Sequence, residues 1–64
     1  MKVYIEKEDK HLELDIEISG IELLKRLDIN PSAVILVKND EVVLEDEFLE
    51  KDDRIKILSV ISGG

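Results

Sequence analysis

The chain has 64 residues, no cysteine and a formal net charge of −7, with sixteen Asp and Glu residues against nine Lys and Arg residues. This length suits one small domain, and the lack of cysteine excludes disulfides, a thiol nucleophile and a thiolate metal ligand. The acidic balance argues against direct nucleic-acid binding and favours a partner with a basic docking surface, although acidity also keeps a small domain soluble. Because the N-terminus becomes charged within a few residues, we expect no signal peptide, no membrane span and a cytoplasmic protein.

Two segments near the N-terminus alternate between apolar and polar side chains. In residues 1–7, Met1, Val3 and Ile5 share one face, and residues 11–19 alternate more cleanly. A charged turn separates the two segments. The pattern predicts an antiparallel hairpin with one face in water.

A short helix should follow this hairpin. Ser19 and Glu22 have capping-box spacing, so each side chain can satisfy a free backbone N–H group of the first turn. Asn30, which precedes Pro31, is pushed out of the helical region and should end the helix. A helix of under three turns is marginal alone, so a sheet must hold it. The apolar stripe expected to face that sheet is Ile21, Leu23, Leu24 and Leu27.

The second half of the chain predicts three further strands. The run AVILVK at residues 33–38 is continuously apolar, as in a central strand. Asn39 and Asp40 tolerate positive φ and should form a tight turn into a short strand at residues 41–44. The last strand, residues 54–60, alternates again.

An acidic connection precedes the last strand. Phe48 and Leu49 are its apolar residues and should anchor it to the core. The run lacks the ligand spacing and the central glycine of a calcium loop, so we expect a solvated loop that contributes at most to a docking surface. His11, the one histidine, is expected to be solvated or capping, and no serine is matched by a His–acid pair. Without a glycine-rich phosphate loop, the chain should not bind ATP itself.

The order of elements and the terminal Gly-Gly pair together resemble the ThiS/MoaD family of sulfur carrier proteins. The resemblance covers nearly the whole chain, more loosely in the first hairpin. It departs at Asp40 and Asp52, where the family commonly has glycine. The matching positions are Leu23, Leu24, Leu27, Pro31, Val34, Val37, Asn39, Val43, Leu49, Asp53, Ile55, Ile57, Gly63 and Gly64.

This resemblance implies an α+β, β-grasp (ubiquitin-like) fold with the order ββαβββ. A mixed sheet of four to five strands would pack on one helix. The β-grasp domain should span residues 1–60, and residues 61–64 should form a flexible C-terminal tail. The core candidates are Leu14, Ile16, Leu24, Leu27, Ile55 and Ile57, with Val34 and Leu36 beside them.

Gly64 is the residue expected to carry the chemistry. A carboxylate is a poor electrophile, whereas an acyl-adenylate has a good leaving group. The tail of Ile61, Ser62, Gly63 and Gly64 reaches at most about 13–14 Å, and glycine lets its backbone pass a narrow channel. An isolated Gly-Gly pair is more often a frayed end, but its agreement with the domain pattern favours a functional tail.

The resemblance implies a carrier protein rather than an enzyme. An E1-like adenylating enzyme would use ATP and magnesium to activate Gly64, and sulfide would replace AMP to leave a thiocarboxylate. A sulfur-accepting synthase or a tRNA-thiolation enzyme would then receive the sulfur, in a thiamin, molybdopterin or tRNA-thiolation pathway. The chain should hold no cofactor or metal stably and be a monomer when free. Two alternatives remain: a protein modifier that forms isopeptides through Gly64, and a binding module with an inert tail.

Alternation also leaves apolar residues on the sheet face that one helix cannot cover. Exposed apolar residues are common, but a contiguous group often marks an interface, and ubiquitin-like proteins resemble one another in docking through this face. We expect Tyr4, Val37 and Leu58 to bind the adenylating enzyme, with acidic side chains at the rim steering association. The full predicted docking face is Tyr4, Ile35, Val37, Leu58 and Val60.

Overall fold

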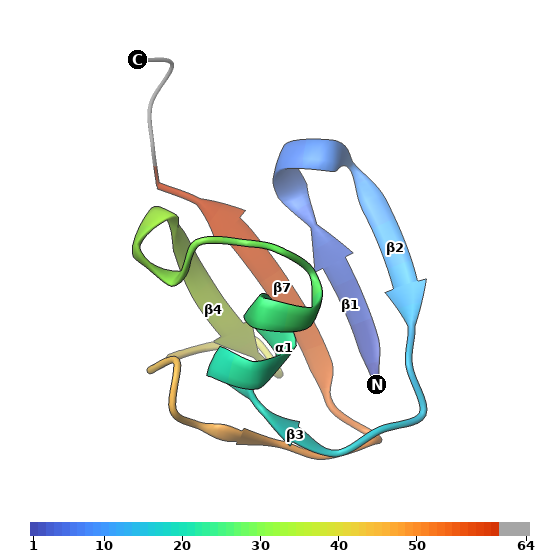
Figure 1. The fold of residues 1–64 in the computed structure, drawn as a ribbon. Coiled ribbons are helices and arrows are strands. Elements are labelled where there is room, and N and C mark those ends of the chain that lie inside the picture. Colours follow the sequence, from blue (N-terminus) through green and yellow to red (C-terminus); the bar gives the residue numbers. More distant parts are fainter. Residues whose placement is uncertain (61–64) are drawn as a thin grey trace.

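The structure, a computed structural model, describes residues 1–60, so the predicted tail at residues 61–64 lies outside the described residues. A five-stranded sheet, ordered β2-β1-β7-β4-β5, curves around one helix (Figure 1). β1 and β7 run parallel at its centre, and the other neighbours are antiparallel. This arrangement confirms the predicted mixed β-grasp sheet. The strands are β1 (Lys2–Ile5), β2 (Lys10–Glu13), β4 (Val34–Lys38), β5 (Glu41–Val43) and β7 (Arg54–Ser59), and the helix is α1 (Gly20–Arg26).

The first hairpin is shorter than its alternating pattern predicts. A 3₁₀ turn at Glu6–Glu8 and Asp9, which has a φ of 47°, form the charged turn. β2 then ends at Glu13, because the N–H of Leu14 bonds the carbonyl of Met1 at 2.8 Å and β1 extends no further. The chain leaves the large sheet there, although burial continues to alternate along it.

A second, two-stranded sheet was not predicted. β3 (Ile18–Ser19) pairs antiparallel with β6 (Phe48–Leu49), with Ile18 opposite Leu49. Leu49 is fully buried, as expected of an anchor, but Phe48 is 54% exposed. The prediction for Phe48 was therefore wrong, because successive residues of a strand point to opposite faces.

The helix begins where the capping pattern predicts. Ser19 has extended backbone angles, and its Oγ accepts a hydrogen bond from the N–H of Glu22 at 3.3 Å. The helix ends at Arg26, before the predicted Asn30–Pro31 stop, and the chain turns through Asp28 with a φ of 58°. Pro31 instead begins a 3₁₀ turn, Pro31–Ala33, that leads into β4.

The core lies between α1 and the inner face of the sheet. Of the predicted core residues, Leu24, Leu36, Ile55 and Ile57 are buried, while Leu14, Leu27 and Val34 are partly buried and pack against them. Ile16 is also only partly buried and does not belong to this cluster. The buried apolar residues absent from that prediction are Met1, Val3, Ile5, Leu23, Val37 and Leu49. In residues 1–60, no helix is long and apolar enough to cross a membrane.

Candidate functional site

The end of β7 is the last described segment before the predicted tail. β7 runs between β1 and β4, in the middle of the sheet. The N–H of Ser59, the last residue of β7, bonds the Glu6 carboxylate at 3.2 Å, and the N–H of Val60 just past it bonds the carbonyl of Ala33 at 3.0 Å. The chain is therefore held firmly up to Val60. The predicted tail residues Ile61, Ser62, Gly63 and Gly64 lie outside the described residues.

The predicted docking face is on the side of the sheet opposite the helix. Ile35 and Leu58 are direct neighbours in the β4–β7 ladder. Val60 lies two residues after Leu58, just past the end of β7. Ile35 is 39% exposed, Val60 is 45% exposed and Leu58 is half-buried. These three residues form a small apolar group beside the point where the chain leaves the sheet.

The other two predicted docking residues are placed less favourably. Val37 shares this face but is only 8% exposed, between its ladder neighbours Val42 and Lys56. Lys56 also stands opposite Tyr4 on β1, so it separates Tyr4 from the apolar group. The structure thus brings Ile35, Leu58 and Val60 together but not the whole predicted set.

Tyr4 belongs to a polar environment. Its hydroxyl donates to the Asp9 carboxylate at 2.9 Å, and its ring centroid is 4.6 Å from that of His11. The hydrogen bond to Asp9 is the main cause of a raised Tyr4 pKa. Around it, the outer face carries Lys2, Arg54 and Lys56 together with Asp9 and Glu13, so this part of the face is polar and of mixed charge.

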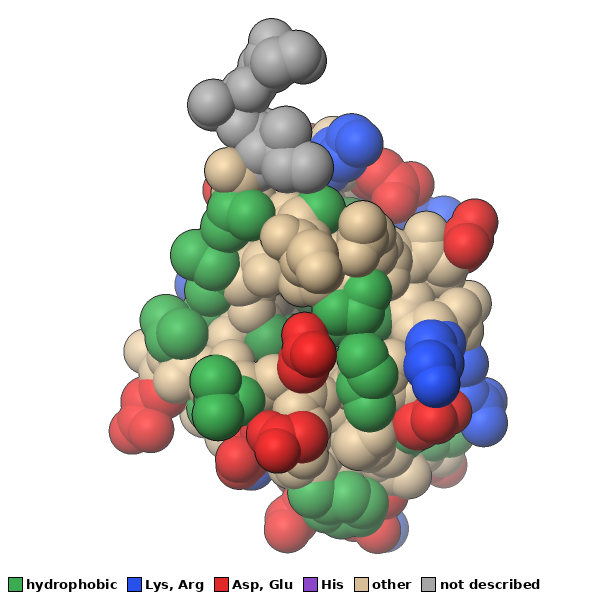
Figure 2. Space-filling view, turned by 60° about the vertical axis from the view of Figure 1, so that its left-hand side comes forward, with side chains coloured by type: hydrophobic (Ala, Val, Ile, Leu, Met, Phe, Trp, Pro, Cys, Tyr) green, Lys and Arg blue, Asp and Glu red, His purple; other side chains and the backbone are tan. Residues whose placement is uncertain are grey.

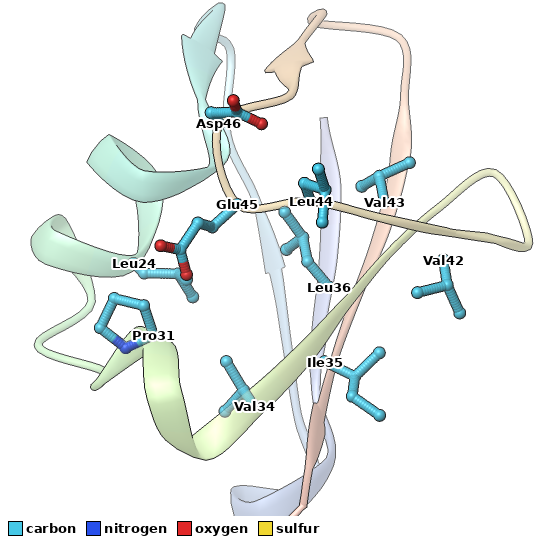
Figure 3. Close-up of a pocket in the computed structure, with 10 residues that line it drawn as sticks. All are labelled: Leu24, Pro31, Val34, Ile35, Leu36, Val42, Val43, Leu44, Glu45 and Asp46. Carbon is cyan, nitrogen blue, oxygen red and sulfur yellow. The ribbon is translucent and has the colours of Figure 1, made fainter.

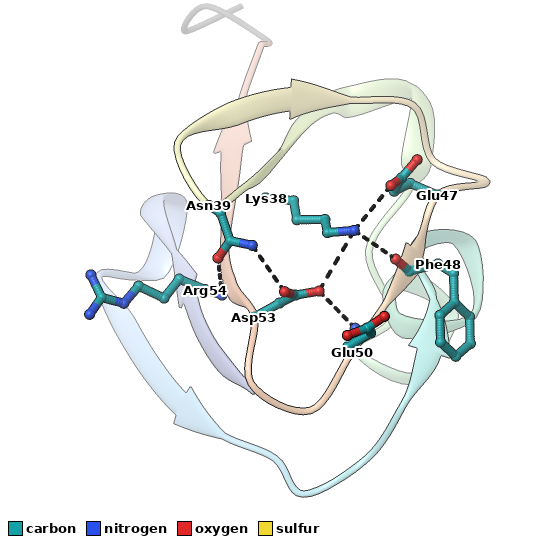
Figure 4. A network of polar contacts seen from close by, with 7 residues as sticks. All are labelled: Lys38, Asn39, Glu47, Phe48, Glu50, Asp53 and Arg54. Atoms are coloured by element: carbon teal, nitrogen blue, oxygen red, sulfur yellow. Dashed lines mark hydrogen bonds and ion pairs between the residues drawn. The ribbon is translucent and has the colours of Figure 1, made fainter.

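A polar network ties the β4–β5 turn to the loop before β7 (Figure 4). Asp53 Oδ1 accepts from Asn39 Nδ2 at 2.9 Å, and Asp53 Oδ2 accepts from the N–H of Glu50 at 2.8 Å. Lys38 Nζ lies 3.8 Å from Asp53 Oδ2 and donates to Glu47 at 3.0 Å. The bonds from Glu50 and Asn39 lower the pKa of Asp53, and the bond to Glu47 raises the pKa of Lys38. Part of the predicted solvated loop is therefore fixed by specific contacts.

A groove at the β5 edge of the sheet was missed by the sequence analysis. It has a volume of about 430 Å³ and lies between β4, β5 and the loop that follows β5 (Figure 3). Val42 and Leu44 at its side are 73% and 77% exposed. The alternation of Val42 and Leu44 in the segment EVVL could have indicated this groove. It placed two apolar side chains on a short strand that no predicted element covers.

Catalytic or metal-binding arrangements are not found in the described part of the chain. His11 is exposed on β2 and contacts Tyr4. Within residues 1–60, no group of three or more His, Asp or Glu side chains could hold a metal ion.

Sequence comparison relates the chain to known proteins along most of its length. Residues 1–61 match a family described as small archaeal modifier protein 2. The sulfur carrier protein TtuB of Thermus thermophilus is 32% identical over 54 residues, which cover 78% of this chain and 83% of that protein. An uncharacterized protein of Archaeoglobus fulgidus is 38% identical over 55 residues, with 81% of each chain covered.

Structural comparison agrees with the observed topology. The crystal structure of the thiamine biosynthesis protein ThiS from Geobacter metallireducens gives a TM-score of 0.67 at 21% identity, with both chains fully covered. A solution structure of a thiamine biosynthesis protein from the same organism gives 0.62 at 19% identity, with 100% of this chain and 88% of that one covered. At this identity, the likeness establishes the β-grasp fold alone.

Proposed function

This chain belongs to the small archaeal modifier protein 2 family and is a ThiS/MoaD-like, ubiquitin-like sulfur carrier protein; from this premise we propose that its Gly64 carries sulfur as a thiocarboxylate. The observation that supports the proposal most is the match over residues 1–61, which Ser62 separates from the Gly63-Gly64 pair. The β-grasp body serves to present this chain end to a partner.

The proposed chemistry takes place in an E1-like adenylating enzyme that binds ATP and magnesium. A carboxylate oxygen of Gly64 attacks the α-phosphorus of ATP, and pyrophosphate leaves. Sulfide then adds to the acyl carbon of the adenylate, and AMP leaves with the bonding electron pair. Conversion to the adenylate is required because the free carboxylate is anionic and resonance-stabilised.

The described residues form the body that docks on the enzyme, while the tail reaches into it. β7 lies at the sheet centre, and the Val60–Ala33 bond fixes the residue that follows it. Four residues beyond Val60 extend at most about 13–14 Å, so the body must dock within that distance of the reacting phosphate. The proposed docking face is the group of Ile35, Leu58 and Val60, beside the exit.

Intact-mass spectrometry tests the proposal directly. The purified chain is incubated with its cognate adenylating enzyme, ATP, magnesium and a sulfide source. We expect a mass in which one oxygen is replaced by sulfur, with the change located on Gly64 after proteolysis. An unchanged mass with an enzyme that is active on a control substrate would refute the sulfur-carrier chemistry.

A protein modifier is the second candidate, and the description of the matching family favours it. In that case a lysine amine of another protein attacks the same activated carbonyl, AMP leaves and an isopeptide forms. Both functions share the adenylation step. Peptides with Gly64 linked to a lysine side chain, recovered from cells by mass spectrometry, would establish this second function.

The destination of the sulfur is also part of the proposal. Thiamin, molybdopterin and thiolated tRNA remain the candidate products. Deleting the gene and measuring all three products separates them, because loss of one product assigns the sulfur-accepting synthase or tRNA-thiolation enzyme. Restoration by the wild-type gene, but not by a gene lacking the Gly64 codon, would link that loss to the carried sulfur.

A further inference from the structure

The two free edges of the five-stranded sheet present different side chains. At one edge, β2 exposes Lys10 and Glu13. At the other, the apolar residues Val42 and Leu44 are largely exposed. Proteins commonly protect a free edge with charged side chains, because an apolar edge pairs readily with another strand. On the β5 side Glu41 is the charged residue of the strand, and the edge from Val42 to Leu44 is apolar and suited to receive a partner strand.

β5 is also too short to cover all of β4. The ladder joins Glu41–Val43 to residues 36–38, so Val34 and Ile35 have no strand partner on that side. The groove in Figure 3 occupies the place where a longer β5 would continue. Figure 2 turns this side of the molecule forward and shows apolar side chains along its left part, with acidic side chains between them.

Backbone groups of β4 point into this gap. Successive residues of an antiparallel strand direct their N–H and carbonyl groups to alternate sides. Ala33 and Asn39 point to β7, since they bond Val60 at 3.0 Å and Arg54 at 2.8 Å. The carbonyl of Val34 therefore points away from β7 and into the groove, beside the end of β5.

Charge distinguishes the classes of occupant. Glu45 and Asp46 line the groove, and in Figure 3 the Glu45 carboxylate reaches across it toward Leu24 and Pro31. Among the described residues that line the groove, none is Lys or Arg. A second copy of the chain, with its own charge of −7, would bring an equally acidic edge and be repelled. A segment with apolar and basic side chains fits both the apolar wall and the acidic rim.

We propose that this edge binds an extended segment of the adenylating enzyme, bearing apolar side chains and at least one Lys or Arg, as an added β-strand. The inference rests on the proposed function, because it assigns the occupant to the enzyme that activates Gly64. The location of the groove agrees with binding to the adenylating enzyme. Val34 follows Ala33, which holds Val60, so the groove begins where the chain leaves the sheet.

Charge reversal at the groove tests the proposal. Glu45→Lys is compared with Glu13→Lys, which changes the net charge equally but lies on the opposite edge strand. Affinity for the purified adenylating enzyme is measured by titration calorimetry, and a thermal melt checks the fold of each variant. We expect Glu45→Lys to weaken binding about tenfold and Glu13→Lys to weaken it less than about twofold. An equal loss in both variants would assign the effect to net charge and overturn the proposal.

Amide hydrogen exchange supplies a readout that charge alone does not change. Because Val42 is opposite Val37 and its neighbours Glu41 and Val43 bond β4, the N–H of Val42 points to the free edge. In the enzyme complex we expect this amide to exchange more slowly, while the amides of β2 are unaffected. Unchanged exchange at Val42 in a saturated complex would rule out strand addition. If the enzyme slows exchange at Val42 but the complex releases no pyrophosphate from ATP, the proposed function fails while strand addition at this edge stands.

Discussion

The side chain of Asn39 donates to the carboxylate of Asp53 at 2.9 Å, across fourteen positions of sequence. Asn39 Oδ1 also accepts from the N–H of Arg54 at 2.9 Å. One turn residue therefore bonds Arg54, the first residue of the last strand, and Asp53 just before it. Asn39 itself has a φ of 51°, a conformation that Asn adopts more readily than most residues. The β4–β5 turn thereby fixes the entry into β7.

Asp53→Asn should destabilise the fold. Asp53 accepts bonds from Asn39 and Glu50 while near Lys38, and its side chain is only 13% exposed. An amide offers one acceptor oxygen where the carboxylate offers two, so we expect a loss of about 1–2 kcal/mol in the free energy of unfolding near pH 7. Urea denaturation measures it. Asp52→Asn, at an exposed neighbour, is the control and should leave the midpoint nearly unchanged.

The same residue gives a pH dependence. Its pKa is lowered from an ordinary value of 3.8, chiefly by the Glu50 N–H and then by Asn39. The ionised carboxylate therefore stabilises the folded protein fully above the unfolded pKa, and this contribution is lost as the pH falls through the lower folded pKa. The wild-type protein should lose more stability than Asp53→Asn when the pH is lowered below about 4. Parallel acid titrations would contradict this role of Asp53.

Gly20→Ala tests the close packing of the helix start. A Cβ at Gly20 would lie 2.5 Å from Leu36 Cδ2 and 2.7 Å from the carbonyl oxygen of Glu45. Alanine favours a helix over glycine by about 1 kcal/mol, but overpacking costs about 1–3 kcal/mol and the carbonyl cannot easily move. We expect a net loss of stability in urea denaturation. A stabilised variant would show that the surroundings relax, and Ser32→Ala serves as an exposed control.

Periodic patterns predicted the strands of the large sheet, and the capping pattern predicted the start of the helix. Alternation placed Val3 and Ile5 on one face, which is the buried one, although neither was among the core candidates. The turn at Asn39 follows from residues that tolerate positive φ. The β3–β6 sheet was not predictable in this way, because a two-residue strand has no period and depends on a partner distant in sequence. Phe48 was misassigned for that reason.

The candidate site was predicted in part. Alternation placed Ile35 and Leu58 on the same face, as the β4–β7 ladder shows. It did not predict the burial of Val37, which depends on neighbours that other strands supply. It also missed the groove, since the short length of β5 relative to β4 becomes visible only when both strands are placed.

Gly63→Val should block activation and leave the fold unchanged. If the tail passes a narrow channel in the adenylating enzyme, a branched side chain cannot follow where glycine can. Deleting Gly64 should act similarly by shortening the reach. Pyrophosphate release measures activation, and amide spectra of the same samples report the fold. Normal turnover of the valine variant would show that the double glycine is not required.

Leu58→Asp tests the proposed docking face. Leu58 is opposite Ile35 and follows Ile57, whose burial shows that the two faces of β7 were assigned correctly. Placing a carboxylate among Ile35 and Val60 would desolvate a charge on binding, and truncating an anchor of this kind costs about 2 kcal/mol or more. We therefore expect affinity for the adenylating enzyme, measured by calorimetry, to fall at least tenfold, about 1.4 kcal/mol.

The matched control for this variant is Phe48→Asp, which changes an exposed apolar residue on β6, outside the large sheet. It introduces the same negative charge, so a loss confined to Leu58→Asp identifies the face rather than the charge. Because Leu58 is half-buried, Ile35→Asp provides a second variant at a more exposed position of the same group. If both variants keep their melting temperatures and bind the enzyme as tightly as the wild-type chain, the docking face lies elsewhere.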